Sequence, residues 1–183
     1  MVSNDAEEGF RDRLIGAQRG DPRAFDELVR WLEAPLVGFL RARGAEDAEG
    51  MAQEVLVRVF GAVERFEGGS AEFRGWVFKI ARNMLIDERR YWARRGQVVA
   101  TPNDELPHGV AVDHPLDGMD QRERVETILS DLTDEQREVL LLRVVAGLTV
   151  EETARAVGRR PGAVRALQHR ALGRLRRLLS RRP

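Results

Sequence analysis

The chain has 183 residues but no cysteine, only one lysine and only three histidines. Without cysteine it has no disulfide bonds and no thiolate metal sites. The histidines, His108, His114 and His169, form no ligand cluster, so we expect neither a metal nor any other cofactor. No apolar run approaches the roughly 20 residues of a membrane helix. The first residues, MVSNDAEEGF, are acidic and lack the apolar run of a signal peptide. We therefore expect a soluble, cytoplasmic protein without membrane insertion.

The sequence also lacks the usual patterns of catalysis. It contains no glycine-rich phosphate loop, no metal-ligand spacing and no paired nucleophile and base. We therefore expect a protein that is not an enzyme.

A net charge of zero hides strong segregation of charge along the chain. Residues 153–183 contain ten arginines and no acid, and residues 65–95 contain eight bases and four acids. Between them, residues 96–131 contain eight acids and two bases. A single charged run is usually a solvated face, but ten arginines without an acid favour a partner of opposite charge. Two basic blocks separated by an acidic one indicate two contacts with nucleic acid.

Hydrophobic periodicity is helical nearly throughout. Asp21-Pro22 is a typical helix start, and apolar residues then recur every three or four positions until Gly44. Two more helices are expected at about 46–66 and 71–95. Residues 96–118 contain three prolines and little periodicity, which is typical of a flexible linker.

Helix returns near Met119, with capping boxes at Thr133–Gln136 and Thr149–Glu152. The sequence therefore predicts an all-α protein with two small helical domains, residues 1–95 and 119–183, joined by a flexible acidic linker (96–118).

The stretch TVEETARAVGRRPGAVRALQHRAL, residues 149–172, has the spacing of a helix-turn-helix. Small Ala154 allows close packing of two helices, Gly158 fits the turn, and apolar Val164 lies on the second helix. Such a second helix enters the DNA major groove, and the surrounding arginines suit the phosphate backbone.

Residues 71–95 interleave aromatic and basic side chains. Aromatic rings among cations suit single-stranded nucleic acid, in which unstacked bases pack on rings. Core packing explains Phe73, Trp76 and Phe78 equally well at this stage. Asn83 and Asp87 lie four residues apart, so they share a helix face and can hydrogen-bond bases or each other.

Two sets of motifs resemble the extracytoplasmic-function (ECF, group IV) RNA polymerase sigma factors. Three short runs are similar to sigma region 2: Asp47-Ala48-Glu49, Phe73-Arg74-Gly75-Trp76 and Ile80-Ala81-Arg82-Asn83. Leu132–Val145 and the helix-turn-helix are similar to region 4. The resemblance covers about 22–95 and 120–178. It implies a transcription initiation factor that binds RNA polymerase core through the beta-prime and beta subunits and directs it to promoter DNA.

The resemblance also implies roles for individual residues. The polymerase core would bind at Asp47, Glu49, Gln53 and Glu54. The minus-10 element, as non-template single strand, would be read and opened by Phe73, Trp76, Lys79, Arg82, Asn83, Asp87 and Arg90. The minus-35 duplex would be read by Arg159, Arg160, Arg165, Gln168, His169 and Arg170. Family members are commonly held by an anti-sigma factor, which adds such a protein to the expected partners.

Gly50 and Arg160 depart from the family pattern, which has an acid and a capping serine or threonine at these positions. An ordinary helix-turn-helix regulator that acts without polymerase core is the alternative. It would account for residues 132–183 but leave the aromatic and basic block unexplained.

Overall fold

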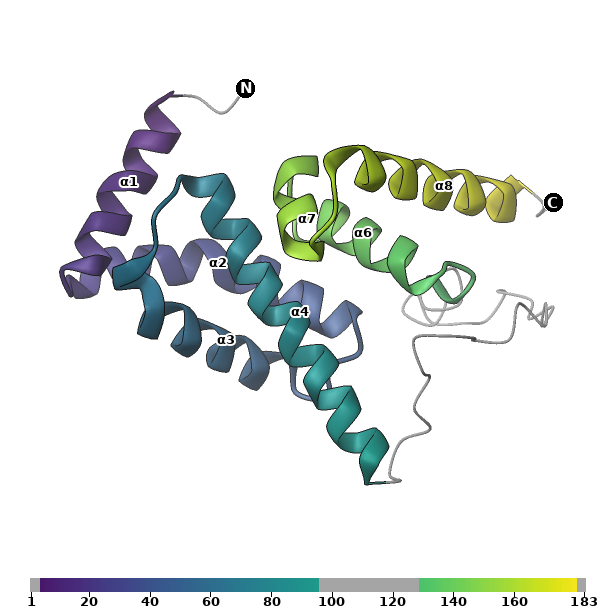
Figure 1. Cartoon of the computed structure of the whole chain (residues 1–183), viewed down its shortest axis with the longest axis horizontal. Coiled ribbons are helices and arrows are strands. Elements are labelled where there is room, and N and C mark those ends of the chain that lie inside the picture. Colours follow the sequence, from purple (N-terminus) through teal and green to yellow (C-terminus); the bar gives the residue numbers. More distant parts are fainter. Residues whose placement is uncertain (1–3, 96–128, 181–183) are drawn as a thin grey trace.

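The computed structural model describes residues 4–95 and 129–180, and within these ranges every regular element is a helix (Figure 1). The N-terminal bundle contains α1 (Asn4–Gln18), α2 (Pro22–Ala42), α3 (Ala48–Ala62), a 3-10 turn (Val63–Arg65) and α4 (Ser70–Arg94). The C-terminal bundle contains α6 (Asp134–Val144), α7 (Val150–Val157) and α8 (Pro161–Ser180). The predicted all-α class is confirmed. The predicted linker, 96–118, lies outside the described residues.

Local capping sets several helix ends where the sequence predicts them. The Asp21 side chain accepts a hydrogen bond from Arg23 N at 2.9 Å, and Pro22 begins α2. Thr133 begins α6 and Thr149 begins α7, each with the reciprocal capping box. The second predicted helix is shorter than expected, because α3 ends at Ala62 and the 3-10 turn follows.

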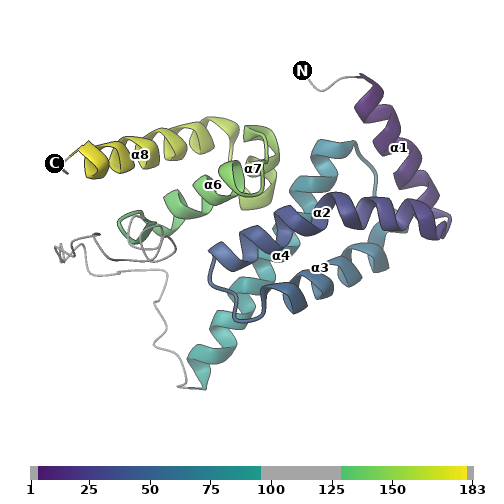
Figure 2. The ribbon, with the colours of Figure 1, turned by 180° about the vertical axis from the view of Figure 1, so that it is seen from behind.

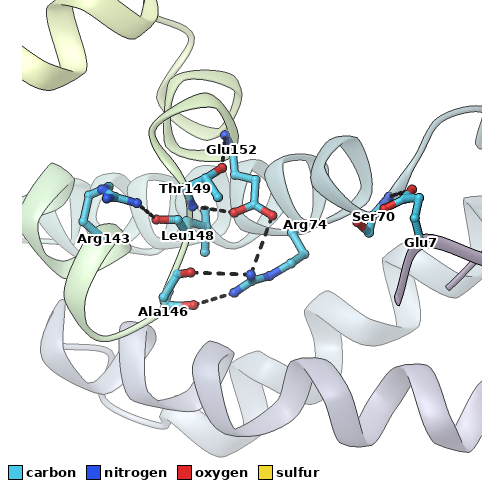
Figure 3. Close-up of polar contacts among 9 residues, drawn as sticks. Glu7, Ser70, Arg74, Arg143, Ala146, Leu148, Thr149 and Glu152 are labelled. Carbon is cyan, nitrogen blue, oxygen red and sulfur yellow. Dashed lines mark hydrogen bonds and ion pairs between the residues drawn. The ribbon is translucent and has the colours of Figure 1, made fainter. Parts of the chain in front are cut away.

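Helix α1 was not among the predicted helices. It buries Phe10, Leu14 and Ala17 against the N-terminal bundle. Its Glu7 carboxylate accepts hydrogen bonds from the backbone N of Ser70, at 2.8 Å, and from the Ser70 hydroxyl. Since Gly69 precedes α4 without a capping side chain, Glu7 supplies the cap from 63 residues away (Figure 3).

One continuous apolar core extends through both bundles. Leu141, Leu142, Ala146, Leu148 and Ala156 of the C-terminal bundle belong to the same buried cluster as the core of α1–α4. Helix α7 lies directly against α4, as both ribbon views show (Figures 1 and 2). The two bundles therefore pack closely together instead of lying apart. In the part of the chain that the structure describes, no helix has the length and apolar character to cross a membrane.

Candidate nucleic-acid interface

The helix-turn-helix consists of α7, a tight turn and α8. Gly158 has φ +68° and ψ 33°, a left-handed conformation that glycine adopts without steric cost, and it caps α7. After the turn, Pro161 begins α8. Ala154 of α7 packs on Val164 and Leu167 of α8, together with Val139 of α6. This is the arrangement that the spacing of Ala154, Gly158 and Val164 predicts.

The predicted minus-35 residues lie on or just before α8, and most are exposed. Arg165 is paired with Glu151 at 3.0 Å, and Arg159 is paired with Glu135. Gln168 is partly buried and its Oε1 accepts a hydrogen bond from Arg143 Nε at 3.3 Å. The remaining three, Arg160, His169 and Arg170, are exposed. Helix α8 packs on α6 and α7 and lies on the side of the C-terminal bundle away from α4 (Figure 1).

Five predicted minus-10 residues form one stripe along α4, which we call the minus-10 stripe: Trp76, Lys79, Asn83, Asp87 and Arg90. Their spacing of three and four residues places them on one helix face. Lys79, Asn83, Asp87 and Arg90 are exposed, and Arg90 lies 4.0 Å from Asp87. Trp76 is half-buried and stacks on Phe66, with ring centroids 5.1 Å apart.

Phe73 does not belong to this exposed surface. Its side chain is 0% exposed and packs against Phe10, Phe66 and Trp76. Phe78 is equally buried and packs against Phe39. A ring without exposed surface has no face on which a base could stack, so both phenylalanines are core residues here. The expected contact of Phe73 with the opened strand therefore does not fit this geometry, whereas Trp76 keeps a partly exposed ring.

Arg82 also differs from the stripe. It lies on the neighbouring side of α4, where its Nε donates to Oε1 of Glu138 in α6 at 3.0 Å. A residue expected to meet the minus-10 strand is thus bound to an acid of the C-terminal bundle.

The predicted polymerase-binding residues surround the beginning of α3. Asp47 caps this helix by accepting from Gly50 N at 2.8 Å. A Cβ on residue 50 would lie 2.2 Å from Oδ2 of Asp47, so the glycine that departs from the family pattern leaves room for this cap. Glu49 is paired with Arg41 and Glu54 with Arg58, while Gln53 is exposed. We call Asp47, Glu49, Gln53 and Glu54 the α3 face.

Two further residues extend this face, and the sequence did not single them out. Val57, one turn after Gln53, is an apolar side chain that is 71% exposed. Glu88 of α4 lies near Glu46 and Asp47, and burial together with these two negative charges raises its pKa. The surface thus combines several carboxylates, two of them paired with arginines, with one exposed apolar side chain.

Comparison with known proteins agrees with this arrangement. The family described as Sigma-70 region 2 matches residues 24–95, and the family described as Sigma-70, region 4 matches residues 122–175. The ECF RNA polymerase sigma factor ShbA of Streptomyces griseus is 35% identical over 178 residues, covering 88% of this chain and 91% of that protein. The ECF RNA polymerase sigma factor SigD of Mycobacterium tuberculosis is 35% identical over 170 residues, covering 87% and 79%.

Solved structures show the same fold. CnrH in complex with the cytosolic domain of CnrY is 25% identical, with a TM-score of 0.69 and coverage of 96% of this chain and 99% of that one. The sigma factor RpoE of Bartonella quintana, in complex with the anti-sigma factor NepR, is 25% identical, with a TM-score of 0.65 and coverage of 85% and 96%. With both sigma regions present in order, and with relatives matched over most of their length, the chain belongs to the ECF RNA polymerase sigma factors.

Proposed function

We propose that this sigma factor joins RNA polymerase core and directs it to promoters, with α8 reading the minus-35 duplex and α4 reading the minus-10 non-template strand. The observation that carries the proposal is the presence of two exposed surfaces of different chemistry. One is α8, the arginine-rich second helix of the helix-turn-helix. The other is the minus-10 stripe of α4, which combines an aromatic ring, an amide and cationic side chains.

Helix α8 has the chemistry for duplex recognition. Its exposed arginines can pair with phosphates, and an arginine at the start of a recognition helix can bind guanine O6 and N7 bidentately. Arg165, His169 and Arg170 lie on its exposed surface. Glu151 and Glu135 hold Arg165 and Arg159 before DNA arrives, so DNA must displace or share these ion pairs.

The minus-10 stripe has the chemistry for single-stranded DNA. The Trp76 ring can stack on an unpaired base, and the exposed Asn83 amide can both donate to and accept from a base edge. Lys79 and Arg90 can contact the backbone phosphates of the strand. Strand opening then draws its free energy from capture of unpaired bases, so the chain acts by binding and does not catalyse a reaction.

The α3 face, with Val57 and Glu88, is the surface proposed for docking on the beta-prime coiled coil of the polymerase. Exposed acids steer a basic partner, and an exposed apolar side chain adds contact area at the centre. The polymerase and the chromosome place this activity in the cytoplasm. The RpoE structure contains an anti-sigma factor, which supports a partner of that class for this chain as well.

A regulator that binds DNA alone would use α8 but would leave the α3 face and the minus-10 stripe without a role. One experiment distinguishes a sigma factor from such a regulator. The chain is mixed with purified polymerase core and a promoter fragment, and unpaired thymines are then detected by permanganate footprinting. We expect duplex opening only when both the chain and the core are present.

Two variants distinguish assembly with polymerase core from opening of the duplex. Asn83→Ala should assemble with core and bind minus-35 duplex, but should reduce thymine reactivity. The double variant Gln53→Ala, Glu54→Ala should fail earlier, at assembly with core. If the chain alone binds the promoter as tightly as its mixture with core, and core adds no opening, the regulator function replaces the proposed one.

A further inference from the structure

Helix α1 holds the segment that leads into α4 at both of its ends. At one end, the side-chain amide of Gln18, the last residue of α1, donates to the carbonyl oxygens of Val63, at 3.0 Å, and Phe66, at 2.9 Å. At the other end, Glu7 accepts from the backbone and the hydroxyl of Ser70 (Figure 3). The path of the chain between the 3-10 turn and α4 is therefore fixed by contacts with α1.

The two hydrogen bonds from Gln18 fix the 3-10 turn as a unit. A side-chain amide has two N–H donors, so one glutamine can satisfy both carbonyl oxygens. Val63 begins the turn and Phe66 follows its last residue, so the amide joins the start of the turn to its end. Because Gln18 is half-buried, these bonds are stronger than they would be in water.

Phe66 connects this contact to the minus-10 stripe. Its ring stacks on Trp76, with centroids 5.1 Å apart and 23° between the ring planes, and it meets Phe73 edge-on, also at 5.1 Å. Phe10 of α1 packs on Phe73 in turn, at 5.4 Å. Helix α1 thus supports the Trp76 ring in two ways, through the backbone of Phe66 and through a chain of aromatic rings.

The loop after Phe66 folds closely onto the same ring. Gly68 has φ +148°, a conformation that other residues rarely adopt. A Cβ at this position would lie 3.1 Å from Cζ of Phe66 and 2.9 Å from Cβ of Glu72. The Phe66 ring therefore packs on the loop as well as on Trp76, and its position depends on the path that α1 fixes.

This stack determines how Trp76 can meet an unpaired base. Phe66 covers one face of the Trp76 ring, so a base that stacks on this ring must use the opposite face. A side chain that is immobilised only on binding weakens that binding, whereas a side chain that is already fixed does not. Any contact that holds Phe66 in place therefore strengthens capture of a base by Trp76.

We propose that α1 is a positioning element for reading of the minus-10 strand, and that Gln18 is its positioning residue because it holds Phe66 against the Trp76 ring. The proposal rests on the proposed function for the contact between Trp76 and the strand. Its structural part, the dependence of the Trp76 ring on Gln18, is a property of the free chain. The family described as Sigma-70 region 2 matches residues 24–95, so α1 lies outside the matched residues.

Fluorine NMR of the full chain labelled with 5-fluorotryptophan tests the structural part. The chain has three tryptophans, and the spectrum of Trp76→Phe assigns one signal to residue 76. Gln18→Glu keeps nearly the same size but has no amide hydrogens for the two carbonyl oxygens. We expect it to move the Trp76 signal and to increase the difference between light and heavy water, which reports solvent access to the ring. Asp12→Asn, on the exposed side of α1, should leave the signal in place.

Strand binding by holoenzyme tests the functional part. The probe is a fluorescent single-stranded oligonucleotide with the non-template minus-10 sequence of a promoter mapped by in vitro transcription. Gln18→Glu should bind this probe about two- to tenfold more weakly, the usual cost of immobilising one side chain. Assembly with core and binding of minus-35 duplex should not change, which also shows that the variant is folded. Phe39→Leu, which loosens the core where Phe39 packs on Phe78, controls for a general loss of stability and should bind the probe normally.

A double-mutant cycle tests whether Gln18 acts through Phe66. Phe66→Leu keeps an apolar side chain but removes the stacked ring, so it should weaken probe binding by itself. Adding Gln18→Glu should cause no further loss, because the residue through which Gln18 acts has gone. Independent losses, unchanged probe binding by Gln18→Glu, or an unmoved Trp76 signal would each overturn the positioning role. If Trp76→Ala binds the probe as tightly as wild type, the proposed contact of Trp76 with DNA is wrong, whereas the fluorine result for Gln18 would stand.

Discussion

Nε of Arg82 in α4 lies 3.0 Å from Oε1 of Glu138 in α6, so one arginine of the expected minus-10 surface is bound to the C-terminal bundle. A contact of Arg82 with the minus-10 strand, which the proposed function expects, would have to displace or share this ion pair. Variants of α4 therefore need to be measured both in the free chain and with polymerase.

Arg165→Ala should weaken binding of holoenzyme to minus-35 duplex by about 1–3 kcal/mol if Arg165 contacts a guanine bidentately. The measurement is a titration of fluorescent minus-35 duplex, repeated with each base pair substituted. We expect the preference at one position to relax while the others persist.

Glu151→Ala is the matched test, because it frees Arg165 from its ion pair without removing the arginine. It should leave base preference intact and strengthen binding slightly. An unchanged preference in Arg165→Ala would remove this residue from the minus-35 contacts.

Glu88→Gln should stabilise the fold while weakening binding to polymerase core. Burial and the charges of Glu46 and Asp47 raise the pKa of Glu88, so its ionised form costs stability at neutral pH. The gain in melting temperature should be present at pH 7 and vanish below about pH 4.3, where Glu88 is protonated in both the folded and unfolded states.

The companion measurement is affinity for core, which should fall several-fold if Glu88 belongs to the docking surface. Glu33→Gln should change neither quantity. A more stable variant that binds core normally would restrict docking to α3.

Glu7→Gln should destabilise the chain by about 1 kcal/mol at pH 7, since Glu7 caps α4 through Ser70. The hydrogen bonds from Ser70 hold the pKa of Glu7 below its ordinary value. Its stabilisation is therefore complete above about pH 4.3 and is lost as the pH falls through the lowered pKa.

Urea unfolding at several pH values checks this dependence, with Asp12→Asn on the exposed side of α1 as control. The difference between wild type and Glu7→Gln should shrink in acid. A difference that grows in acid would contradict the capping role.

Phe73→Ala should reduce the free energy of unfolding by about 3–5 kcal/mol, because it empties a fully buried site among Phe10, Phe66 and Trp76. Trp76→Ala should cost less stability and should reduce permanganate reactivity at temperatures where the variant is folded. If Phe73→Ala keeps its stability yet abolishes opening, Phe73 contacts DNA in a rearranged state.

Features that depend on local chemistry were predictable from the sequence. The caps at Asp21, Thr133 and Thr149 need partners within three residues, and the turn at Gly158 needs only a left-handed backbone. The stripe from Trp76 to Arg90 follows from helical spacing alone. Each of these is fixed by chemistry within one or two turns of helix.

Features that depend on distant contacts were not predictable. Helix α1 is stabilised by burial of Phe10 and by the bond between Glu7 and Ser70, 63 residues apart. The burial of Phe73 depends on the rings of Phe10 and Phe66, which come from two other segments, as well as on Trp76 of the same helix. The same holds for two contacts between the bundles, the approach of α7 to Gly75 and the pairing of Arg82 with Glu138. The spacing of these residues along the chain does not indicate that they meet.

The most direct test of the account is in vitro transcription with purified core on a library of genomic fragments, with start sites mapped for wild type, Arg165→Ala and Asn83→Ala. We expect wild-type starts to share one minus-35 and one minus-10 sequence, Arg165→Ala to relax the first, and Asn83→Ala to impair opening at the second. Starts without shared elements, or an identical start map for all three proteins, would contradict promoter reading by α8 and α4.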